Sequence, residues 1–208
     1  MRRSSPTQLK IGALILAAGA SSRMGRPKML LPWGNRTIIG HLIDQCLHIG
    51  VEQLAIVTSP DNQDLDRELG RLGFPEQNRI RNPAPEGGMY SSIQCAARWS
   101  GWQAGLTHWA LALGDQPHLQ PRTLLALMNL GTAHPEAICQ LTRNGRPRHP
   151  VLLPASAFEQ LASSRHRTLK EFLQAIAVNV ILQESDDAGL DLDIDQPGDY
   201  EKAVRLFS

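Results

Sequence analysis

The sequence predicts an α/β protein with three layers, in which helices cover both faces of a doubly wound, mostly parallel sheet. Through the first 130 residues, short apolar runs alternate with segments whose apolar residues recur at helical spacing, and such alternation is typical of a parallel sheet. Two strand-like runs around Gly145 predict a small antiparallel element over residues 137–153. No internal repeat or linker divides the chain, so we expect a single domain over residues 1–208, with residues 1–10 flexible.

The first half of the chain begins with an apolar run over residues 11–16, whose length and composition suit a buried strand. From Thr37, apolar residues recur at helical spacing until Gly50 ends the pattern. Further strands are predicted at residues 54–58, 79–82 and 109–113, with a short helix that ends at Gly70. Another helix is expected to begin at Ser91 or Ser92, either of which suits an N-cap, and to run to about Trp99.

In the second half, Pro121 suits the first position of a helix that Gly131 would end. The remaining strands are predicted at residues 137–141, 149–153 and 178–182, and the remaining helices at residues 156–162, 168–176 and 197–207.

Composition excludes several classes of protein. The formal net charge is +1, with 42% apolar and 20% charged residues, so no overall field predicts a nucleic-acid partner or an acidic membrane. The three cysteines, Cys46, Cys95 and Cys139, are far apart and predict neither a disulfide framework nor a zinc site. No run is long enough to span a bilayer, and we expect a cytoplasmic protein.

The turn after the first strand has the features of an anion site. Small residues at 17–22 are followed by three cations, Arg23, Arg26 and Lys28, and main-chain N–H groups with such cations bind anions. Five residues separate Gly19 from Gly25, and Arg26-Pro27 follow, so the stretch is not a Walker A loop. The plain alternative is a strand, a turn and a solvated basic segment.

An acidic residue, Asp115, follows the predicted strand at 109–113. A carboxylate at the end of a strand suits Mg²⁺, although Asp is also frequent in a Gly-Asp-x-Pro turn. The opening loop, the segment 82–92 and the Asp115 turn all follow predicted strands. Because ligands bind at the carboxyl ends of strands in such sheets, we expect these three loops to meet in one crevice.

Residues 16–28 read Leu-Ala-Ala-Gly-Ala-Ser-Ser-Arg-Met-Gly-Arg-Pro-Lys. They match every specified position of Leu-Ala-Ala-Gly-x-Ser-x-Arg-Met-Gly-x-Pro-Lys, and the chain thereby resembles the MobA-like NTP transferases, above all the molybdenum cofactor cytidylyltransferase branch. The resemblance implies a nucleotidyltransferase fold in which this loop wraps the triphosphate. It implies that Arg23, Lys28 and Asp115 are catalytic. The nucleotide site that it implies consists of Leu16, Ala17, Ala18, Gly19, Arg23, Lys28, Asn82, Gly88, Ser91 and Ser92.

Two further segments carry the metal assignment. Residues 113–117, Leu-Gly-Asp-Gln-Pro, repeat the branch's motif, which implies that Asp115 binds the metal. Residues 193–200 are similar to the branch's Asp-Ile-Asp-Thr-Pro-Glu-Asp-Tyr, with Gln196 and Gly198 as departures. This similarity implies that Asp195 is the second metal ligand and Asp193 a structural residue. An Asp at position 195 also suits the N-cap of the last helix.

Two other segments resemble the branch less closely. Residues 82–93 are similar to its Asn-x-x-x-x-x-Gly-Met-x-x-Ser segment, which implies contact with the base and ribose. Arg148-His149-Pro150-Val151 resembles a Gly-His-Pro-Val motif, with Arg148 in place of glycine. The resemblance implies that Arg148 and His149 bind the acceptor.

The function that the resemblance implies is transfer of CMP from CTP to a phosphorylated pterin, the molybdenum cofactor, with Mg²⁺ and with Mn²⁺ as a substitute. The acceptor phosphate carries close to two negative charges, so it needs no general base. A molybdoenzyme or its chaperone would be a further partner. Ala17-Ala18-Gly19 and Pro27-Lys28 favour the cytidylyl branch over the guanylyl one. The alternatives are another NTP transferase that acts on a sugar or alcohol phosphate, and a cofactor-binding maturation partner without turnover.

Overall fold

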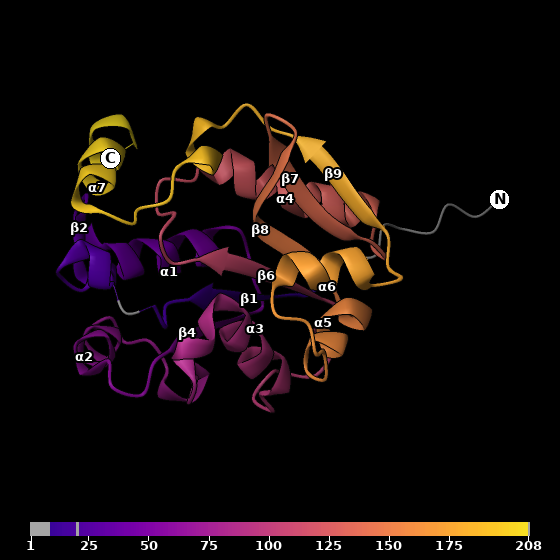
Figure 1. Ribbon diagram of the computed structural model, residues 1–208, viewed down its shortest axis with the longest axis horizontal. Helices are drawn as coiled ribbons and strands as arrows, with labels where there is room; N and C mark the ends of the chain where they lie inside the picture. The colour runs from indigo at the N-terminus through magenta and orange to yellow at the C-terminus, as the bar shows by residue number, and fades with distance from the viewer. Residues whose placement is uncertain (1–8, 20, 208) are drawn as a thin grey trace.

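A single seven-stranded sheet crosses the molecule in the computed structural model, which describes residues 9–19 and 21–207 (Figure 1). The predicted flexibility of residues 1–10 falls mostly outside these residues. In sheet order the strands are β5 (Arg79–Arg81), β4 (Gln53–Thr58), β1 (Ile11–Leu16), β6 (His108–Leu113), β8 (Arg146–Pro154), β7 (Ile138–Arg143) and β9 (Val180–Glu184). A separate antiparallel pair consists of β2 (Pro32–Trp33) and β3 (Arg36–Thr37).

The strand directions confirm the predicted fold class. Strands β5, β4, β1 and β6 are parallel, β8 is antiparallel to both β6 and β7, and β9 is parallel to β7. The predicted hairpin is therefore the β7–β8 pair. Because β8 runs against β6, its first residues lie beside the carboxyl end of β6, at the edge where ligands bind in parallel sheets.

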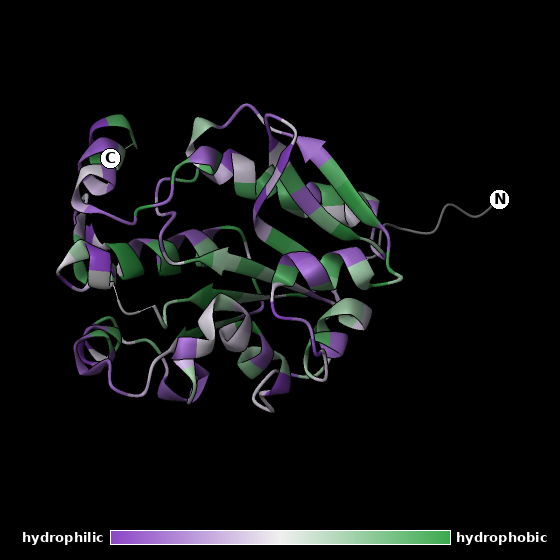
Figure 2. Cartoon of the chain, in the orientation of Figure 1, coloured by the Kyte–Doolittle hydropathy of each residue, from purple (hydrophilic) through white to green (hydrophobic). Residues whose placement is uncertain are grey.

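Helices cover both faces of the sheet, as predicted. Side chains of β1 alternate between the faces: Ala13 and Ile15 pack with α1, α2 and α4, and Leu14 packs with α3, α5 and α6. Figure 2 shows the hydrophobic colour along the strands and on the helix faces that cover them. The helices are α1 (Ile38–His48), α2 (Gln63–Arg71), α3 (Gly88–Arg98), α4 (Pro121–Ala133), α5 (Ala155–Leu161), α6 (Leu169–Ala175) and α7 (Pro197–Phe207).

Helix ends are confirmed where the sequence offers a local cap. Thr37 caps α1, because its hydroxyl oxygen accepts the N–H of Gly40 at 3.3 Å. Pro121 is the first residue of α4, as predicted. Strand β9 begins two residues later than predicted, at Val180.

Two predicted helix ends are wrong. Helix α3 begins at Gly88, and Gly87 rather than Ser91 or Ser92 is its N-cap residue. Helix α4 continues through Gly131 to Ala133. A Cβ atom at position 131 would lie 2.3 Å from Cδ2 of Leu152, so the glycine lets α4 approach β8 and does not end the helix.

The strand order sets the position of the crevice. Strand β1 lies between β4 and β6, so the chain winds outward in both directions from β1. A ligand crevice forms where the loops after two such neighbouring strands diverge. Among the described residues, no helix is long and apolar enough to cross a bilayer.

Candidate active site

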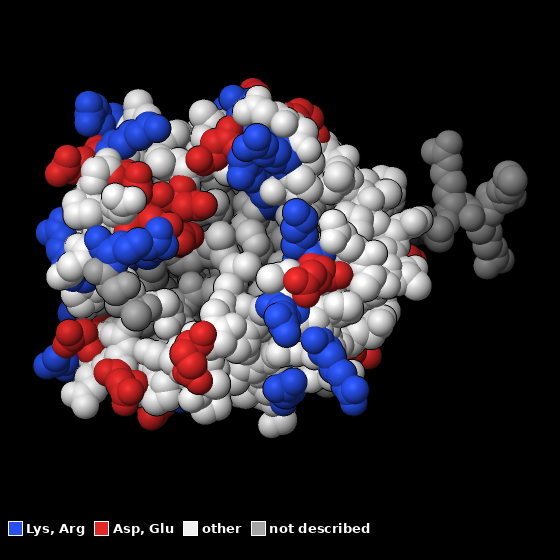
Figure 3. All heavy atoms as spheres, viewed as in Figure 1, with Lys and Arg blue, Asp and Glu red and all other residues white. Residues whose placement is uncertain are grey.

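The three predicted loops meet in one crevice at the carboxyl ends of β1 and β6. The crevice has a volume of about 210 Å³. Figure 3 shows the molecule hollowed between the region of α7 and the region of α6, with acidic and basic side chains along its sides. Its lining comes from all three loops: Leu16, Ala18, Gly19, Pro85, Gly88, Met89, Ser92, Leu113, Gly114 and Asp115.

The opening loop folds back so that Lys28 faces the crevice. Ser21 and Gly25 adopt left-handed backbone angles, with φ of 51° and 70°, and turn the chain twice within five residues. The hydroxyl oxygen of Ser21 accepts the backbone N–H of Lys28 at 3.3 Å and closes the loop. A sequence of small residues therefore brings a cation back to the end of β1.

Two predicted catalytic cations contact the two predicted metal ligands. The Nζ atom of Lys28 lies 3.2 Å from Oδ2 of Asp115 and 3.6 Å from Oδ1 of Asp195. A guanidinium nitrogen of Arg23 lies 3.0 Å from Oδ2 of Asp195. Because Lys28 is 14% exposed and Arg23 is 67% exposed, the lysine forms the less screened of the two contacts.

The burial and the neighbouring charges of Asp115 suit a carboxylate that binds a cation. Burial raises the pKa of Asp115, Lys28 opposes this rise, and the charges of Asp193 and Asp195 add to it. Its Oδ1 atom is buried and has no hydrogen-bond partner among the described residues. An unpaired buried oxygen beside a second carboxylate fits a divalent cation, since Mg²⁺ and Mn²⁺ prefer oxygen ligands.

The three acidic residues Asp193, Asp195 and Asp199 of the C-terminal segment make different contacts. Asp193 accepts a hydrogen bond from Nε2 of Gln116 at 2.8 Å, on the same turn as Asp115. Asp199 accepts the N–H groups of Asp195 and Gln196 at 3.2 and 2.9 Å. The carboxylate of Asp195 therefore points to Arg23 and Lys28, while Asp199 satisfies the N–H groups at the start of α7.

The segment after β5 enters the crevice only in part. Gly88 and Ser92 line it, but Asn82 and Ser91 do not. Asn82 is buried, and its amide nitrogen donates to the hydroxyls of Ser91 and Ser92 at 2.9 and 3.0 Å. Its amide oxygen accepts the N–H of Ala84 at 3.0 Å. Asn82 thus holds the loop to α3, and its contact with a base stays a prediction.

The two predicted acceptor residues point to different places. The guanidinium of Arg148 forms an ion pair with Asp191, away from the crevice lining. The Nδ1 atom of His149 lies 3.4 Å from the carbonyl oxygen of Leu111 on β6, and burial lowers the pKa of His149. Only His149 lines a pocket beside the crevice.

Gly114 and Tyr200 lie in the matched segments 113–117 and 193–200, but the sequence prediction assigns no role to them. A Cβ atom at Gly114 would lie 2.8 Å from the carbonyl oxygen of Leu16, so this glycine lets the ends of β1 and β6 approach closely. Tyr200 of α7 lies under the guanidinium of Arg26, 5.7 Å from ring centre to Cζ, and its hydroxyl donates to the carbonyl of Pro32 at 2.7 Å. These contacts hold α7 to the opening loop. Residue type alone gives no signal for them, because they join distant segments.

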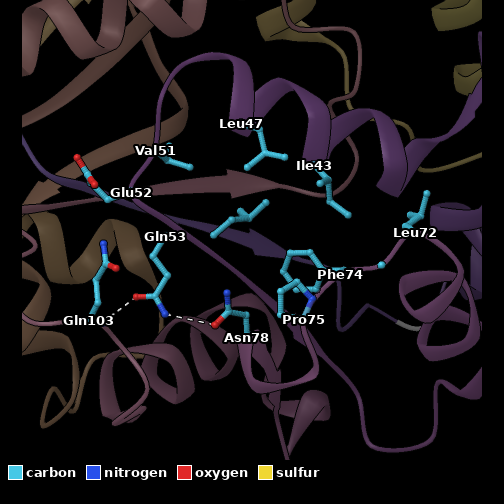
Figure 4. A pocket seen from close by; sticks show the side chains of 12 residues that line it. Ile43, Leu47, Val51, Glu52, Gln53, Leu72, Phe74, Pro75, Asn78 and Gln103 are labelled. Carbon is cyan, nitrogen blue, oxygen red and sulfur yellow. Dashed lines mark hydrogen bonds between the residues drawn. The ribbon is translucent and has the colours of Figure 1, made fainter.

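A different pocket lies at the opposite edge of the sheet, by the amino ends of β4 and β5 (Figure 4). Apolar side chains of Ile43, Leu47 and Phe74 line it. The side-chain amide of Gln53 is hydrogen-bonded within the pocket. Its nitrogen donates to the amide oxygen of Asn78 at 3.3 Å, and its oxygen accepts the backbone N–H of Gln103 at 2.7 Å. The lining of this pocket contains neither Lys28 nor Arg23, nor the carboxylates that they contact.

The chain is similar in sequence to known proteins over most of its length. A family model described as the MobA-like NTP transferase domain matches residues 13–180. The molybdenum cofactor cytidylyltransferase of Escherichia coli is 29% identical over 202 residues, which are 95% of this chain and 97% of that protein. A probable molybdenum cofactor guanylyltransferase of Bacillus mycoides is 21% identical and covers 96% of this chain and 98% of its own length.

Solved structures show the same fold. The crystal structure of Rv0371c from Mycobacterium tuberculosis superimposes with a TM-score of 0.75 at 25% identity, over 96% of this chain and 99% of that one. A structure of that protein in complex with manganese has a TM-score of 0.71 at 23% identity, over 95% of this chain and 99% of that one.

Proposed function

The chain belongs to the MobA-like NTP transferase family and is a nucleotidyltransferase, and on this premise we propose that it transfers CMP from CTP to a phosphorylated pterin. Mg²⁺ is the proposed metal, and pyrophosphate is the second product. The observation that carries the proposal is the contact of Lys28 with both Asp115 and Asp195 at the mouth of the crevice.

The metal assignment rests on the chemistry of the two carboxylates. Asp115 and Asp195 would hold Mg²⁺, which when bound neutralises phosphate charge at the reacting centre. The unpaired Oδ1 of Asp115 supports this role. The manganese complex of the Mycobacterium tuberculosis neighbour is consistent with a divalent metal in this fold. Binding of the metal and the nucleotide would release Lys28 and Arg23 from the carboxylates to the phosphates.

The side chains of this protein would then perform two tasks. Lys28 and Arg23 stabilise the charge that develops on the leaving pyrophosphate, a fixed electrostatic role that needs no proton transfer. The backbone around Gly19 and Gly88 binds the nucleotide, because both glycines line the crevice without a side chain. The acceptor phosphate attacks as a dianion, so the site requires no general base.

The choice of CTP is supported by the loop and by the relatives. Ala17-Ala18-Gly19 and Pro27-Lys28 have the cytidylyl form, and the cytidylyltransferase relative shares more identity with this chain than the Bacillus mycoides guanylyltransferase does. The test is a screen for pyrophosphate release with CTP, GTP, ATP and UTP, each combined with the phosphorylated pterin and with sugar phosphates. Preference for GTP would overturn the cytidylyl assignment, and turnover with a sugar phosphate alone would overturn the pterin acceptor.

Asp115→Ala tests the metal assignment. We expect loss of metal-dependent pyrophosphate release by about 1,000-fold or more, because the variant removes the less exposed of the two carboxylates. Circular dichroism and thermal unfolding should show an intact fold. Asp186→Ala, on an 87% exposed residue whose ion pair with Arg122 lies outside the crevice, is the control. Full activity in Asp115→Ala would show that the metal binds elsewhere.

A further inference from the structure

The two carboxylates at the crevice come from segments that are 80 positions apart in the chain, Asp115 from the turn after β6 and Asp195 from the loop before α7. Residues 192–196, all within the described part of the chain, form neither a helix nor a strand. In Figure 1 they lie in the yellow loop that leads to α7. Because no backbone ladder fixes such a loop, single contacts must determine where it places Asp195.

The turn after β6 is itself fixed to the body of the protein. The backbone N–H of Gly114 donates to the carbonyl oxygen of Leu16 on β1 at 3.1 Å. The Nε2 atom of Gln45 on α1 donates to the carbonyl oxygens of Pro117 and Leu119 at 3.2 and 2.8 Å. The turn is therefore a fixed base against which the C-terminal loop can be placed.

Two hydrogen bonds join the C-terminal loop to this turn. The Nε2 atom of Gln116 donates to Oδ1 of Asp193 at 2.8 Å, and the backbone N–H of Ile194 donates to the carbonyl oxygen of Asp115 at 3.1 Å. Gln116 is 3% exposed and Ile194 is fully buried, while Asp193 is exposed. Because a buried donor without an acceptor is costly, the amide of Gln116 favours the loop position that presents Asp193.

The position of the loop decides what Asp195 can reach. Its Oδ1 atom lies 3.6 Å from Nζ of Lys28, and Oδ2 of Asp115 lies 3.2 Å from the same nitrogen. One cation therefore already lies between the two carboxylates. Mg²⁺ takes oxygen ligands at about 2.0–2.1 Å and demands near-ideal geometry, so a divalent metal between them depends on the loop position even more than the lysine does.

We propose that Gln116 is a positioning residue of the metal site: its hydrogen bond to Asp193 holds the C-terminal loop so that Asp195 and Asp115 face the same cation. The inference rests on the proposed function, since these two carboxylates are the metal ligands there. Neither Gln116 nor Asp193 contacts the metal in this arrangement. Loss of a hydrogen bond that orients metal ligands typically lowers metal affinity by about 10–100-fold.

The first test separates the hydrogen bond from the charge of Asp193. Asp193→Asn and Asp193→Ala both remove the charge, but only Asp193→Ala removes the oxygen that accepts the Gln116 amide. We expect Asp193→Ala to bind Mn²⁺ about tenfold more weakly than Asp193→Asn, with the nucleotide-free protein and the electron paramagnetic resonance signal of free Mn²⁺ as the readout. Equal affinities would overturn the inference, because charge or direct coordination would then be what Asp193 provides.

The second test removes the donor, without a change of charge. Gln116→Leu is compared with Gln53→Leu, because Gln53 donates to Asn78 and to the carbonyl of Gly101, outside the crevice. Thermal unfolding measures the stability that each variant loses. We expect Gln116→Leu to weaken Mn²⁺ binding about tenfold and Gln53→Leu to leave it within about twofold.

Steady-state kinetics give a further readout of Gln116→Leu. The Mg²⁺ concentration for half-maximal rate should rise about tenfold, while kcat at saturating Mg²⁺ should stay within about threefold, because the reacting groups are unchanged. An unchanged Mg²⁺ requirement and Mn²⁺ affinity would overturn the inference. If Gln116→Leu does not fold, the pair at the exposed Asp193 decides the question.

Mn²⁺ binding to Asp115→Ala separates this inference from the proposed function. If Asp115→Ala abolishes Mn²⁺ binding but the two Asp193 variants bind alike, the positioning role is wrong and the metal site stands. If Asp193→Ala binds more weakly than Asp193→Asn but the protein transfers no CMP, the positioning role stands and the proposed reaction is wrong. If Asp115→Ala binds Mn²⁺ like the unmodified protein, both the metal assignment and this inference are wrong.

Discussion

At the scale of single residues, Lys28 is the cation that contacts both predicted metal ligands. It lies between Asp115 and Asp195, is 14% exposed, and is held by the backbone contact with Ser21. Without a ligand its charge offsets those of the two carboxylates. In the proposed function, the same lysine would turn to the phosphates once metal and nucleotide bind.

Lys28→Met should lower pyrophosphate release about 100-fold, because one fixed charge on the leaving group is lost. The pKa of Asp115 should rise further, since Lys28 is the largest influence that lowers it. Steady-state kinetics with CTP and the acceptor measure the first effect. Lys10→Met removes an exposed lysine outside the crevice and should keep normal kinetics; normal kinetics in Lys28→Met as well would remove this lysine from the mechanism.

At the scale of elements, the packing of α4 on β8 determines where Gly131 is needed. The sequence pattern predicts a helix end at this glycine, but α4 continues past it to Ala133, and Leu152 occupies the space that a Cβ atom at position 131 would need. Gly70 of α2 provides the contrast, since a Cβ atom there would meet nothing within 4 Å. Packing therefore requires glycine at position 131 and does not require it at position 70.

Gly131→Ala should destabilise the protein by about 1–3 kcal/mol, because the gain in helix propensity is smaller than the cost of overpacking. Gly70→Ala should stabilise it by about 0.5–1 kcal/mol, because it gains propensity without a clash. Denaturant unfolding of both variants measures the two free energies. If Gly131→Ala stabilised the protein, the Leu152 side chain would have to move away from the new Cβ atom without loss of folding free energy.

At the scale of the whole molecule, buried histidines make stability depend on pH. Burial lowers the pKa of His108 and of His118, each from 6.5. The unfolded chain therefore binds protons that the folded protein does not, and stability falls as pH drops below that value. His118 packs between Trp33 and Phe207, so its protonation would act on the contact of α7 with the body of the protein.

The thermal midpoint should fall between about pH 7 and about pH 5, by roughly 2–4 °C for each kcal/mol lost. His118→Gln should reduce the slope of midpoint against pH, because it removes one of the groups with a lowered pKa. His48→Gln, at an exposed position of α1, should retain the slope of the unmodified protein. Calorimetry over this pH range distinguishes them, and identical slopes in all three proteins would assign the pH dependence to other groups.

The amino-acid sequence by itself determined the fold class, the strands at residues 11–16 and 109–113, and the loop motif that carries Lys28. These features are local: apolar runs, periodicity and spacing within a few residues. It also placed Asp115 at the end of a strand, so the meeting of three loops at one edge followed from the predicted topology.

The tertiary structure alone decided which side chains face one another. In it, Arg148 forms an ion pair with Asp191, and Asn82 is buried and donates hydrogen bonds to two serines. Helix α4 continues past Gly131. The tertiary structure also forms the pocket beside the crevice, whose walls come from α3, α6, β7, β8 and β9. The physical reason is that packing and ion pairing depend on distances between segments far apart in the chain, and residue types along one segment do not specify those distances.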